Sequence, residues 1–132
     1  MIQVLDACTL LAYLRREEGW EEVLRTLDEE QCCAHIANLC EVFYGFGSEF
    51  GEETGHSALH DLREMGIVTH MDSDLDFWTQ VGQHKLNLRR ISLADCMCLT
   101  LAQRLGGVVV TTDHHEFDQV SEIGLCRVRF IR

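Results

Sequence analysis

The chain has 132 residues, of which 46% are hydrophobic and 25% are charged, and these values are typical of one globular domain. They exclude a disordered or low-complexity protein, and no apolar run is long enough to span a membrane, so we expect a single domain over residues 1–132. The 22 acidic and 11 basic side chains give a net charge of −11, which is the wrong sign for general electrostatic attraction to nucleic acid.

The cysteines and the first residues of the chain indicate the compartment. The seven cysteines are odd in number, lie mostly in apolar stretches and form no Cys-x-x-Cys pair. We therefore interpret them as small core residues rather than as disulfides or zinc ligands. The N-terminal residues contain neither a basic leader nor a small-residue cleavage site, so we expect a cytoplasmic protein.

Apolar patterns along the chain alternate between short strand-like runs and helical stripes. In the first half we predict a strand at 2–5, helices at 9–19 and 20–30, a strand at 32–36, and helices at 38–46 and 56–65. In the second half we predict a strand at 67–69, helices at 74–85 and 93–105, and strands at 108–112 and 126–131. In the last strand, apolar residues alternate with arginines, as is typical of an edge strand.

This alternation of strands and helices predicts the fold class. Strands that alternate with helices favour right-handed crossovers and a parallel sheet covered by helices. We therefore predict a three-layer α/β/α fold with a central, mainly parallel five-stranded sheet. In such folds the functional crevice lies at the carboxyl ends of the strands.

Four acidic residues from separate segments can reach that crevice. Asp6 and Asp113 end the first and fourth predicted strands, Glu41 lies one helical turn after the second strand, and Asp95 lies in the first turn of a helix. Clustered carboxylates repel one another unless a cation offsets their charge, and several carboxylates suit Mg²⁺ or Mn²⁺ better than zinc. A cation held there can activate water and polarise a phosphoryl group, so the sequence predicts phosphodiester hydrolysis.

Each acid also has a purely structural interpretation. An acid three residues after a helix cap can satisfy free backbone amides at the start of the helix. Three spacings resemble such capping boxes, namely Asn38-x-x-Glu41, Ser92-x-x-Asp95 and Asp113-x-x-Glu116. Capping does not explain why acids follow particular strands, or why Asp6 ends an apolar one, so the set as a whole favours a site.

Four motifs surround these acids, namely VLDACTLLA at 4–12, NLCEVFYG at 38–45, ISLADCMCL at 91–99 and VTTDHHEFD at 110–118. These motifs resemble those of the PIN-domain family, in the order in which that family has them. The resemblance covers nearly the whole chain, and the short single-domain form is most similar to the VapC-type toxin ribonucleases of prokaryotic toxin–antitoxin pairs.

The resemblance implies a PIN-like α/β/α fold and roles for individual residues. Asp6, Glu41, Asp95 and Asp113 would be the metal-binding and catalytic acids, for Mg²⁺ or Mn²⁺. Thr9 and Thr111 would be hydroxyls that orient an acid or a water. The family often places a further acid after the fourth motif, and either Glu116 or Asp118 could take that place.

The resemblance also implies an activity and partners. The expected function is a metal-dependent endoribonuclease in which water attacks the phosphorus, acting as the toxin of a type II toxin–antitoxin pair. The expected partners are an RNA substrate, a second copy of the chain in a homodimer, and an antitoxin protein, with no membrane association. The segment 41–65 would build the homodimer contact and the groove for an antitoxin peptide.

A polyanionic substrate needs local positive charge, which the chain offers in few places. Lys85, Arg89 and Arg90 form a basic stretch that leads into the helix bearing Asp95, and we expect it to hold phosphates. His114 and His115 we interpret as solvated side chains rather than ligands.

Other functions remain open or are disfavoured by the sequence. A receiver-type phosphoacceptor domain is disfavoured, because it needs a lysine at the end of a late strand and the single lysine, Lys85, precedes a helix. A nucleotide-binding module is disfavoured as well, because no glycine-rich phosphate loop follows any predicted strand. The remaining alternatives are a catalytically weak PIN-fold binding or regulatory module, and a PIN nuclease that acts on DNA or in RNA processing outside a toxin–antitoxin system.

Overall fold

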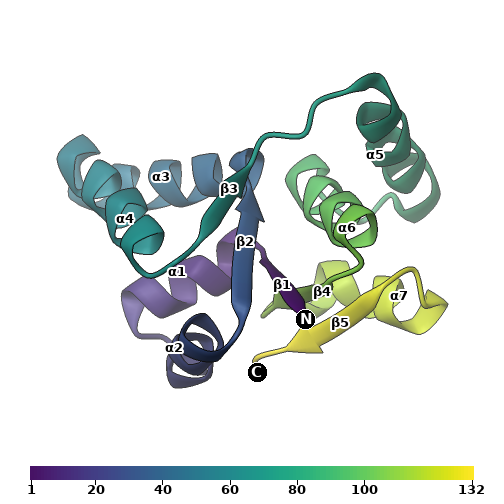
Figure 1. Ribbon diagram of the computed structural model, residues 1–132. Coiled ribbons are helices and arrows are strands. Elements are labelled where there is room, and N and C mark those ends of the chain that lie inside the picture. Colours follow the sequence, from purple (N-terminus) through teal and green to yellow (C-terminus); the bar gives the residue numbers. More distant parts are fainter.

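A computed structural model describes all 132 residues and contains one five-stranded sheet in which every strand pairing is parallel (Figure 1). The strand order is β3-β2-β1-β4-β5, so β3 and β5 are the edges, and the prediction that the last strand lies at an edge is confirmed. The strands are β1 (Ile2–Leu5), β2 (Gln31–His35), β3 (Val68–His70), β4 (Val108–Thr111) and β5 (Arg127–Phe130).

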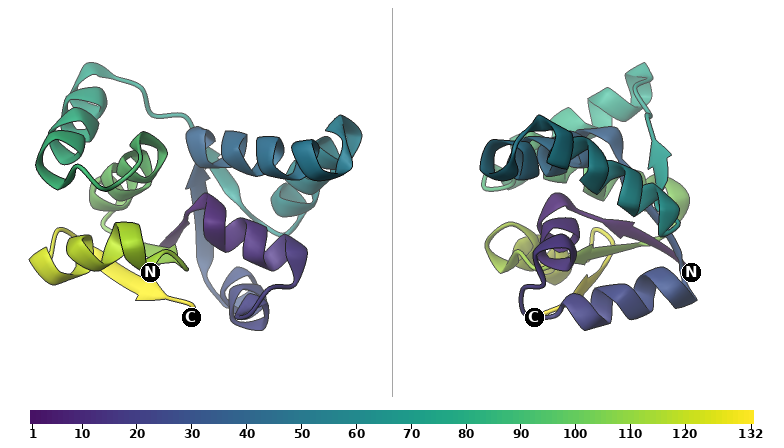
Figure 2. Two further views of the ribbon diagram at one scale, coloured as in Figure 1. Left: turned by 180° about the vertical axis from the view of Figure 1, so that it is seen from behind. Right: turned by 90° about the vertical axis from the view of Figure 1, so that its left-hand side faces the viewer.

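Helices cover both faces of this sheet, which confirms the predicted three-layer α/β/α fold (Figures 1 and 2). The first set of helices connects β1 to β2 and β2 to β3, and the second set connects β3 to β4 and β4 to β5. The first set comprises α1 (Ala7–Arg15), α2 (Trp20–Glu29), α3 (Ile36–Phe50) and α4 (Glu52–Glu64). The second comprises α5 (Leu75–Leu88), α6 (Leu93–Leu105) and α7 (His114–Ile123).

Two hydrophobic cores, one on each face of the sheet, follow from the alternation of side chains along the strands. On β1, Val4 packs into the core formed with α5, α6 and α7, whereas its neighbour Leu5 packs into the core formed with α1 to α4. On β4, Val109 and Val110 divide in the same way. The central strands β1 and β4 are therefore buried on both faces, which explains why they read as largely apolar runs.

The start of α3 differs from the sequence prediction. The helix begins at Ile36, and its N-cap is His35, whose Nδ1 accepts the Ala37 amide at 3.1 Å. Asn38 therefore lies inside the first turn and does not cap the helix. Histidine is not among the common N-cap residues, which explains why the sequence did not predict a helix start at this position.

Two further differences concern elements and cysteines. Helix α7 was not predicted, because only a capping-like spacing marks its start. Four cysteines are buried, as expected for core residues, but Cys8 and Cys40 are exposed and Cys126 is half-buried, so the core interpretation is wrong for Cys8 and Cys40. All seven are free thiols, as predicted.

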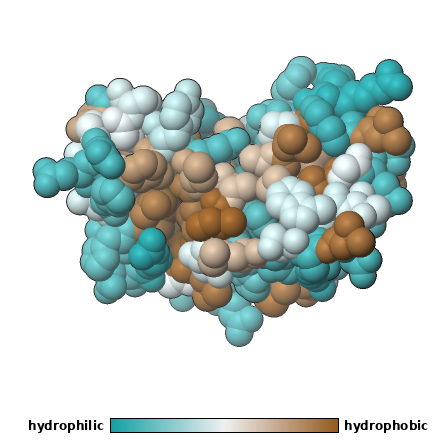
Figure 3. Space-filling view, turned by 90° about the horizontal axis from the view of Figure 1, so that it is seen from above, coloured by the Kyte–Doolittle hydropathy of each residue, from teal (hydrophilic) through white to brown (hydrophobic).

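The molecule presents two lobes with apolar surface between them when it is seen from above (Figure 3). In Figure 1 the α3–α4 pair forms the upper left of the molecule and α5 the upper right. No helix is long and apolar enough to cross a membrane.

Candidate active site at the carboxyl edge of the sheet

The topology reverses between β1 and β4, which are neighbours in the sheet although far apart in the sequence. The chain moves from β1 outward to β3 and then returns to β4 and β5, so the helices that follow β1 and β4 diverge onto opposite faces (Figure 2, left). Such a switch point leaves a crevice at the carboxyl ends of the two strands. Asp6 directly follows β1, and Asp113 follows β4 after one intervening residue.

Asp6 lies at the bottom of this crevice and has no exposed surface. As the N-cap of α1, it accepts the Thr9 amide on Oδ1 at 2.9 Å, and it accepts the Thr111 hydroxyl on Oδ2 at 2.5 Å. Burial raises its pKa to about 6, and the nearby Asp113 charge adds to the rise, although these hydrogen bonds oppose it. Asp6 is therefore a carboxylate that a neighbouring cation would favour in its ionised form.

Thr111 connects Asp6 to Asp113. Its hydroxyl donates to Asp6, and the same oxygen accepts the Asp113 amide at 2.9 Å. Asp113 in turn caps α7 by accepting the Glu116 amide on Oδ1 at 3.0 Å. Thr111 thus forms a hydrogen-bonded link between the two acids.

The hydroxyl of Thr9 links α1 to the end of β4. It donates to the Val110 carbonyl at 3.0 Å and so joins α1 to β4, while the Thr9 amide makes the contact with Asp6. Thr9 therefore supports Asp6 through its backbone and fixes the helix through its side chain.

Ser92, Asp95 and Glu116 form the second half of the site. Ser92 caps α6 by accepting the Asp95 amide at 3.1 Å. The Ser92 amide, however, donates to Glu116 at 3.2 Å, so Glu116 on α7 completes the capping box in place of Asp95. The Asp95 carboxylate is left to face the crevice, and α6 and α7 are joined at their N-terminal ends.

The structure brings Asp95, Asp113 and Glu116 into one group, in which one carboxylate oxygen of each lies within 4.8 Å of the others. Asp118, the other candidate for the additional acid, pairs with His114 at 2.8 Å and does not belong to the group. Three carboxylates at the N-terminal ends of two helices are oxygen donors of the kind that Mg²⁺ and Mn²⁺ prefer. The residues present therefore fit a divalent cation.

Glu41 and Asp6 lie beside this group rather than within it. Loss of hydration raises the pKa of Glu41, and the Glu116 charge raises it further. Cys8, in the first turn of α1, has a pKa of about 12, because loss of hydration and the charges of Asp6, Asp113, Glu116 and Glu41 all disfavour its thiolate. The thiol therefore faces four of the five acids, and it is no nucleophile at neutral pH.

Asn38 holds the segments that carry three of the acids, a role that the sequence reading missed. It has no exposed surface, its Oδ1 accepts the Ala7 amide at 3.3 Å, and its Nδ2 donates to the Ala94 carbonyl at 3.2 Å. Ala7 follows Asp6 and Ala94 precedes Asp95, while Asn38 itself lies three residues before Glu41. The only sequence signal was a polar residue on the buried side of an otherwise apolar helix turn.

His114, the residue after Asp113, makes more contacts than its interpretation as a solvated side chain implies. His114 stacks on Phe130 with ring centroids 4.1 Å apart, and its Nε2 lies 2.8 Å from the Arg132 carbonyl oxygen. The contact with Asp118 raises the pKa of His114. His114 therefore anchors the end of the chain to α7.

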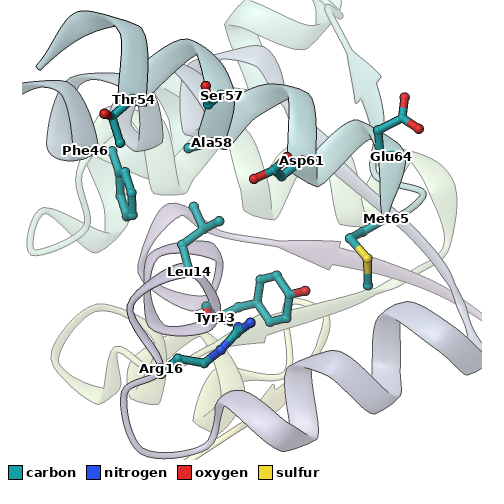
Figure 4. A pocket seen from close by; sticks show the side chains of 10 residues that line it. All are labelled: Tyr13, Leu14, Arg16, Phe46, Thr54, Ser57, Ala58, Asp61, Glu64 and Met65. Atoms are coloured by element: carbon teal, nitrogen blue, oxygen red, sulfur yellow. Dashed lines mark hydrogen bonds between the residues drawn. The ribbon is translucent and has the colours of Figure 1, made fainter. Parts of the chain in front are cut away.

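A groove on another face lies between α1 and the α3–α4 pair (Figure 4). Leu14 from α1 and Phe46 from α3 point into it, and α4 forms the opposite wall. Asp61 and Glu64 give this wall negative charge, whereas Arg16 lies on the α1 side, 4.3 Å from the Trp20 ring. Seven of its ten lining residues fall within the segment 41–65.

The parallel sheet, its switch point and the acids at its carboxyl edge define an α/β protein with an acidic site suited to a divalent cation. The family model of the PIN domain matches residues 4–123, and the chain therefore belongs to the PIN-domain family. No curated protein sequence matches the chain.

Several solved structures share this fold. A DNA-bound VapBC from Salmonella typhimurium is 20% identical over 100% of this chain and 99% of that chain, with a TM-score of 0.74. A toxin–antitoxin complex from Klebsiella pneumoniae is 15% identical over 98% of both chains, with a TM-score of 0.72. A sarcin-ricin loop cleaving VapC toxin from Mycobacterium tuberculosis is 11% identical over 81% of this chain and 86% of that chain, with a TM-score of 0.66.

Proposed function

We propose that this protein is a Mg²⁺- or Mn²⁺-dependent endoribonuclease and the toxin of a type II toxin–antitoxin pair. The observation that carries the proposal is the group of Asp95, Asp113 and Glu116, whose carboxylate oxygens lie within 4.8 Å of one another at the switch point of a PIN fold. Asp6 and Glu41 lie beside the group and complete an acidic crevice.

The chain's own residues would hold and orient the reacting groups. Asp95, Asp113 and Glu116 would bind the cation, with Asp6 fixing Asp113 through Thr111 and Glu41 adding charge from the α3 side. When bound, a divalent cation lowers the pKa of an attacking water and polarises the phosphoryl oxygen. Because the Cys8 thiol stays protonated and no paired Ser–His or Cys–His lies in the crevice, we expect water to be the nucleophile.

The proposed activity is tested by incubating the purified protein with labelled RNAs and single-stranded DNAs in Mg²⁺, Mn²⁺ or EDTA. We expect RNA cleavage that requires metal and that is lost in Asp6→Asn and Asp113→Asn. Replacing Asp95, Asp113 and Glu116 together should cost little more than replacing Asp113 alone, because residues that build one metal site fail as a unit. Metal-dependent cleavage of DNA alone would instead assign a deoxyribonuclease, and binding without cleavage a regulatory module.

We also propose that an antitoxin peptide occupies the groove between α1 and α4. The similar structures include a toxin–antitoxin complex, and the groove combines apolar side chains with both signs of charge. Co-expression with the neighbouring open reading frame should yield a complex that Leu14→Glu weakens. Leu86→Glu, on the exposed surface of α5, is the matched control and should leave the complex intact.

A homodimer and a cytoplasmic location belong to the same proposal. Tyr44 and Phe50 on α3 are exposed aromatic side chains, which a second copy of the chain would cover. Light scattering should give twice the mass of 15.1 kDa, and Tyr44→Glu together with Phe50→Glu should shift the protein toward the monomer.

A further inference from the structure

We infer that Arg89 and Arg90 form the phosphate-binding rim of a groove in which the substrate lies as a single strand of nucleic acid leading away from the acidic crevice. The inference rests on the proposed nuclease function and deepens it, because it names the path and the form of the substrate. Three observations support it: most other arginines are held in ion pairs, the loop at Arg89 and Arg90 is fixed by backbone contacts, and a groove lies between this loop and α7.

Arg89 and Arg90 are consecutive, exposed arginines without a carboxylate partner. Five other arginines are held in ion pairs with carboxylates, which neutralises them. Arg16 lies against the rings of Tyr13 and Trp20. In a chain with a net charge of −11, two adjacent guanidinium groups that no carboxylate neutralises are the local positive charge that a polyanion needs.

Lys85 holds the loop that presents these arginines. Its Nζ donates to the Arg89 carbonyl at 3.1 Å and to the Ile91 carbonyl at 2.7 Å. The expectation that Lys85 itself binds phosphate is therefore replaced by a positioning role. Arg89 has a φ of 60°, which an L-residue adopts at a cost, so the loop conformation depends on such contacts.

The loop borders a groove with a volume of about 710 Å³, whose other wall is α7. The groove begins where the acidic crevice ends: Arg90 Nη2 lies 3.2 Å from His115 Nδ1, while Ser92 contacts Glu116 one residue further along α7. Its volume lies in the range of about 300–1,000 Å³ that holds one small ligand, which suits a nucleotide or two of a single strand.

Polar side chains from two helices line the groove and could meet the edges of unpaired bases. Asn87 at the end of α5 and Gln119 on α7 provide amide groups, and only Leu88 is hydrophobic. Asp118 and Glu122 also line it; Asp118 is paired with His114, which leaves Glu122 as the acid without an ionic partner. The positive charge therefore lies at the end of the groove nearest the crevice, where phosphates next to the scissile one would lie.

The binding test compares Arg89→Gln, Arg90→Gln and the double variant in an Asp113→Asn background, with a short fluorescent single-stranded RNA. Arg63→Gln is the matched control, because Arg63 is an exposed arginine of α4 without a carboxylate partner. We expect a loss of affinity of about tenfold for each rim arginine and no change for Arg63→Gln. The slope of log K against log salt should fall by about 0.7 for each lost contact.

Steady-state cleavage by otherwise wild-type protein separates this inference from the nuclease function. The double variant should raise KM and leave kcat within about threefold, since the arginines bind the strand away from the reacting atoms. Three results would contradict the proposed substrate groove: an unchanged KM in the double variant, an equal loss of RNA affinity in Arg63→Gln, or tighter binding of duplex than of single-stranded RNA. If wild-type protein cleaves nothing but binding still depends on Arg89 and Arg90, the nuclease proposal fails and the groove stands.

Discussion

At the scale of single residues, Asn38 shows how one side chain can position several catalytic groups. A buried asparagine can both donate and accept, and here it accepts from the start of α1 and donates to the start of α6. Because α3 also carries Glu41, one amide sets the spacing of three acids. Aspartate or leucine could not replace it, since each lacks the donor.

We predict that Asn38→Ala lowers the free energy of unfolding by about 2–4 kcal/mol, because it leaves two buried backbone groups without a partner. It should also weaken the stabilisation by Mg²⁺, because the acids lose their mutual spacing. Urea unfolding with and without Mg²⁺ measures both effects, and Asn87→Ala, at an exposed position of α5, is the control. A loss below about 0.5 kcal/mol would contradict the positioning role.

The reactivity of the Cys8 thiol can measure the negative charge of the crevice in the absence of substrate. Its pKa of about 12 predicts that iodoacetamide at pH 8 labels Cys8 much more slowly than Cys40, although both are exposed. Saturating Mg²⁺ should speed the labelling of Cys8, because a cation offsets the acids that disfavour the thiolate. Mass spectrometry of labelled peptides measures both rates. Equal labelling of the two cysteines would show that the acids do not gather around Cys8.

At the scale of elements, the acids differ in whether they also stabilise a helix. Asp113 caps α7 through the Glu116 amide, whereas Asp95 is released from capping because Glu116 takes the Ser92 amide. The sequence could not separate these cases, since Ser92-x-x-Asp95 and Asp113-x-x-Glu116 look alike. The difference arises only when α7 packs beside the start of α6.

The different capping roles predict different stabilities for two alanine variants in the absence of metal. Asp113→Ala should be less stable than Asp95→Ala by about 1 kcal/mol, because only the first loses a cap. Both should lose most of the response to Mg²⁺. Thermal unfolding in EDTA and in Mg²⁺ measures this, and equal stabilities in EDTA would remove the distinction between the two acids.

At the scale of the whole molecule, the fold was predictable because short strand-like runs alternate with helical stripes along the chain, and because the central strands β1 and β4 are buried on both faces. The site was predictable in part, because parallel strands bring Asp6 and Asp113 to one edge. Three features depend on tertiary contacts that local patterns do not contain: the grouping of Glu116 rather than Asp118 with the acids, the role of Asn38, and the start of α3 at Ile36.

The gathering of acids at one edge predicts that divalent cations stabilise the whole fold. At a cation concentration of a hundred times the dissociation constant, the gain in unfolding free energy should be about 2.7 kcal/mol. Sodium chloride at equal ionic strength and the Asp95→Asn variant are the controls, and both should show a much smaller gain. A melting temperature that Mg²⁺ and Mn²⁺ leave unchanged over a wide range would argue against a cation site.

In the proposed mechanism, a water molecule activated at a carboxylate-held cation hydrolyses the phosphodiester. The most direct test of this mechanism is the chemical nature of the RNA ends after cleavage in Mg²⁺ or Mn²⁺, with parallel reactions in EDTA and with Asp113→Asn. We predict a 5′-phosphate and a 3′-hydroxyl, and no cleavage in EDTA or by the variant. A 2′,3′-cyclic phosphate, or full cleavage in EDTA, would contradict the mechanism and leave the acids with structural or regulatory roles.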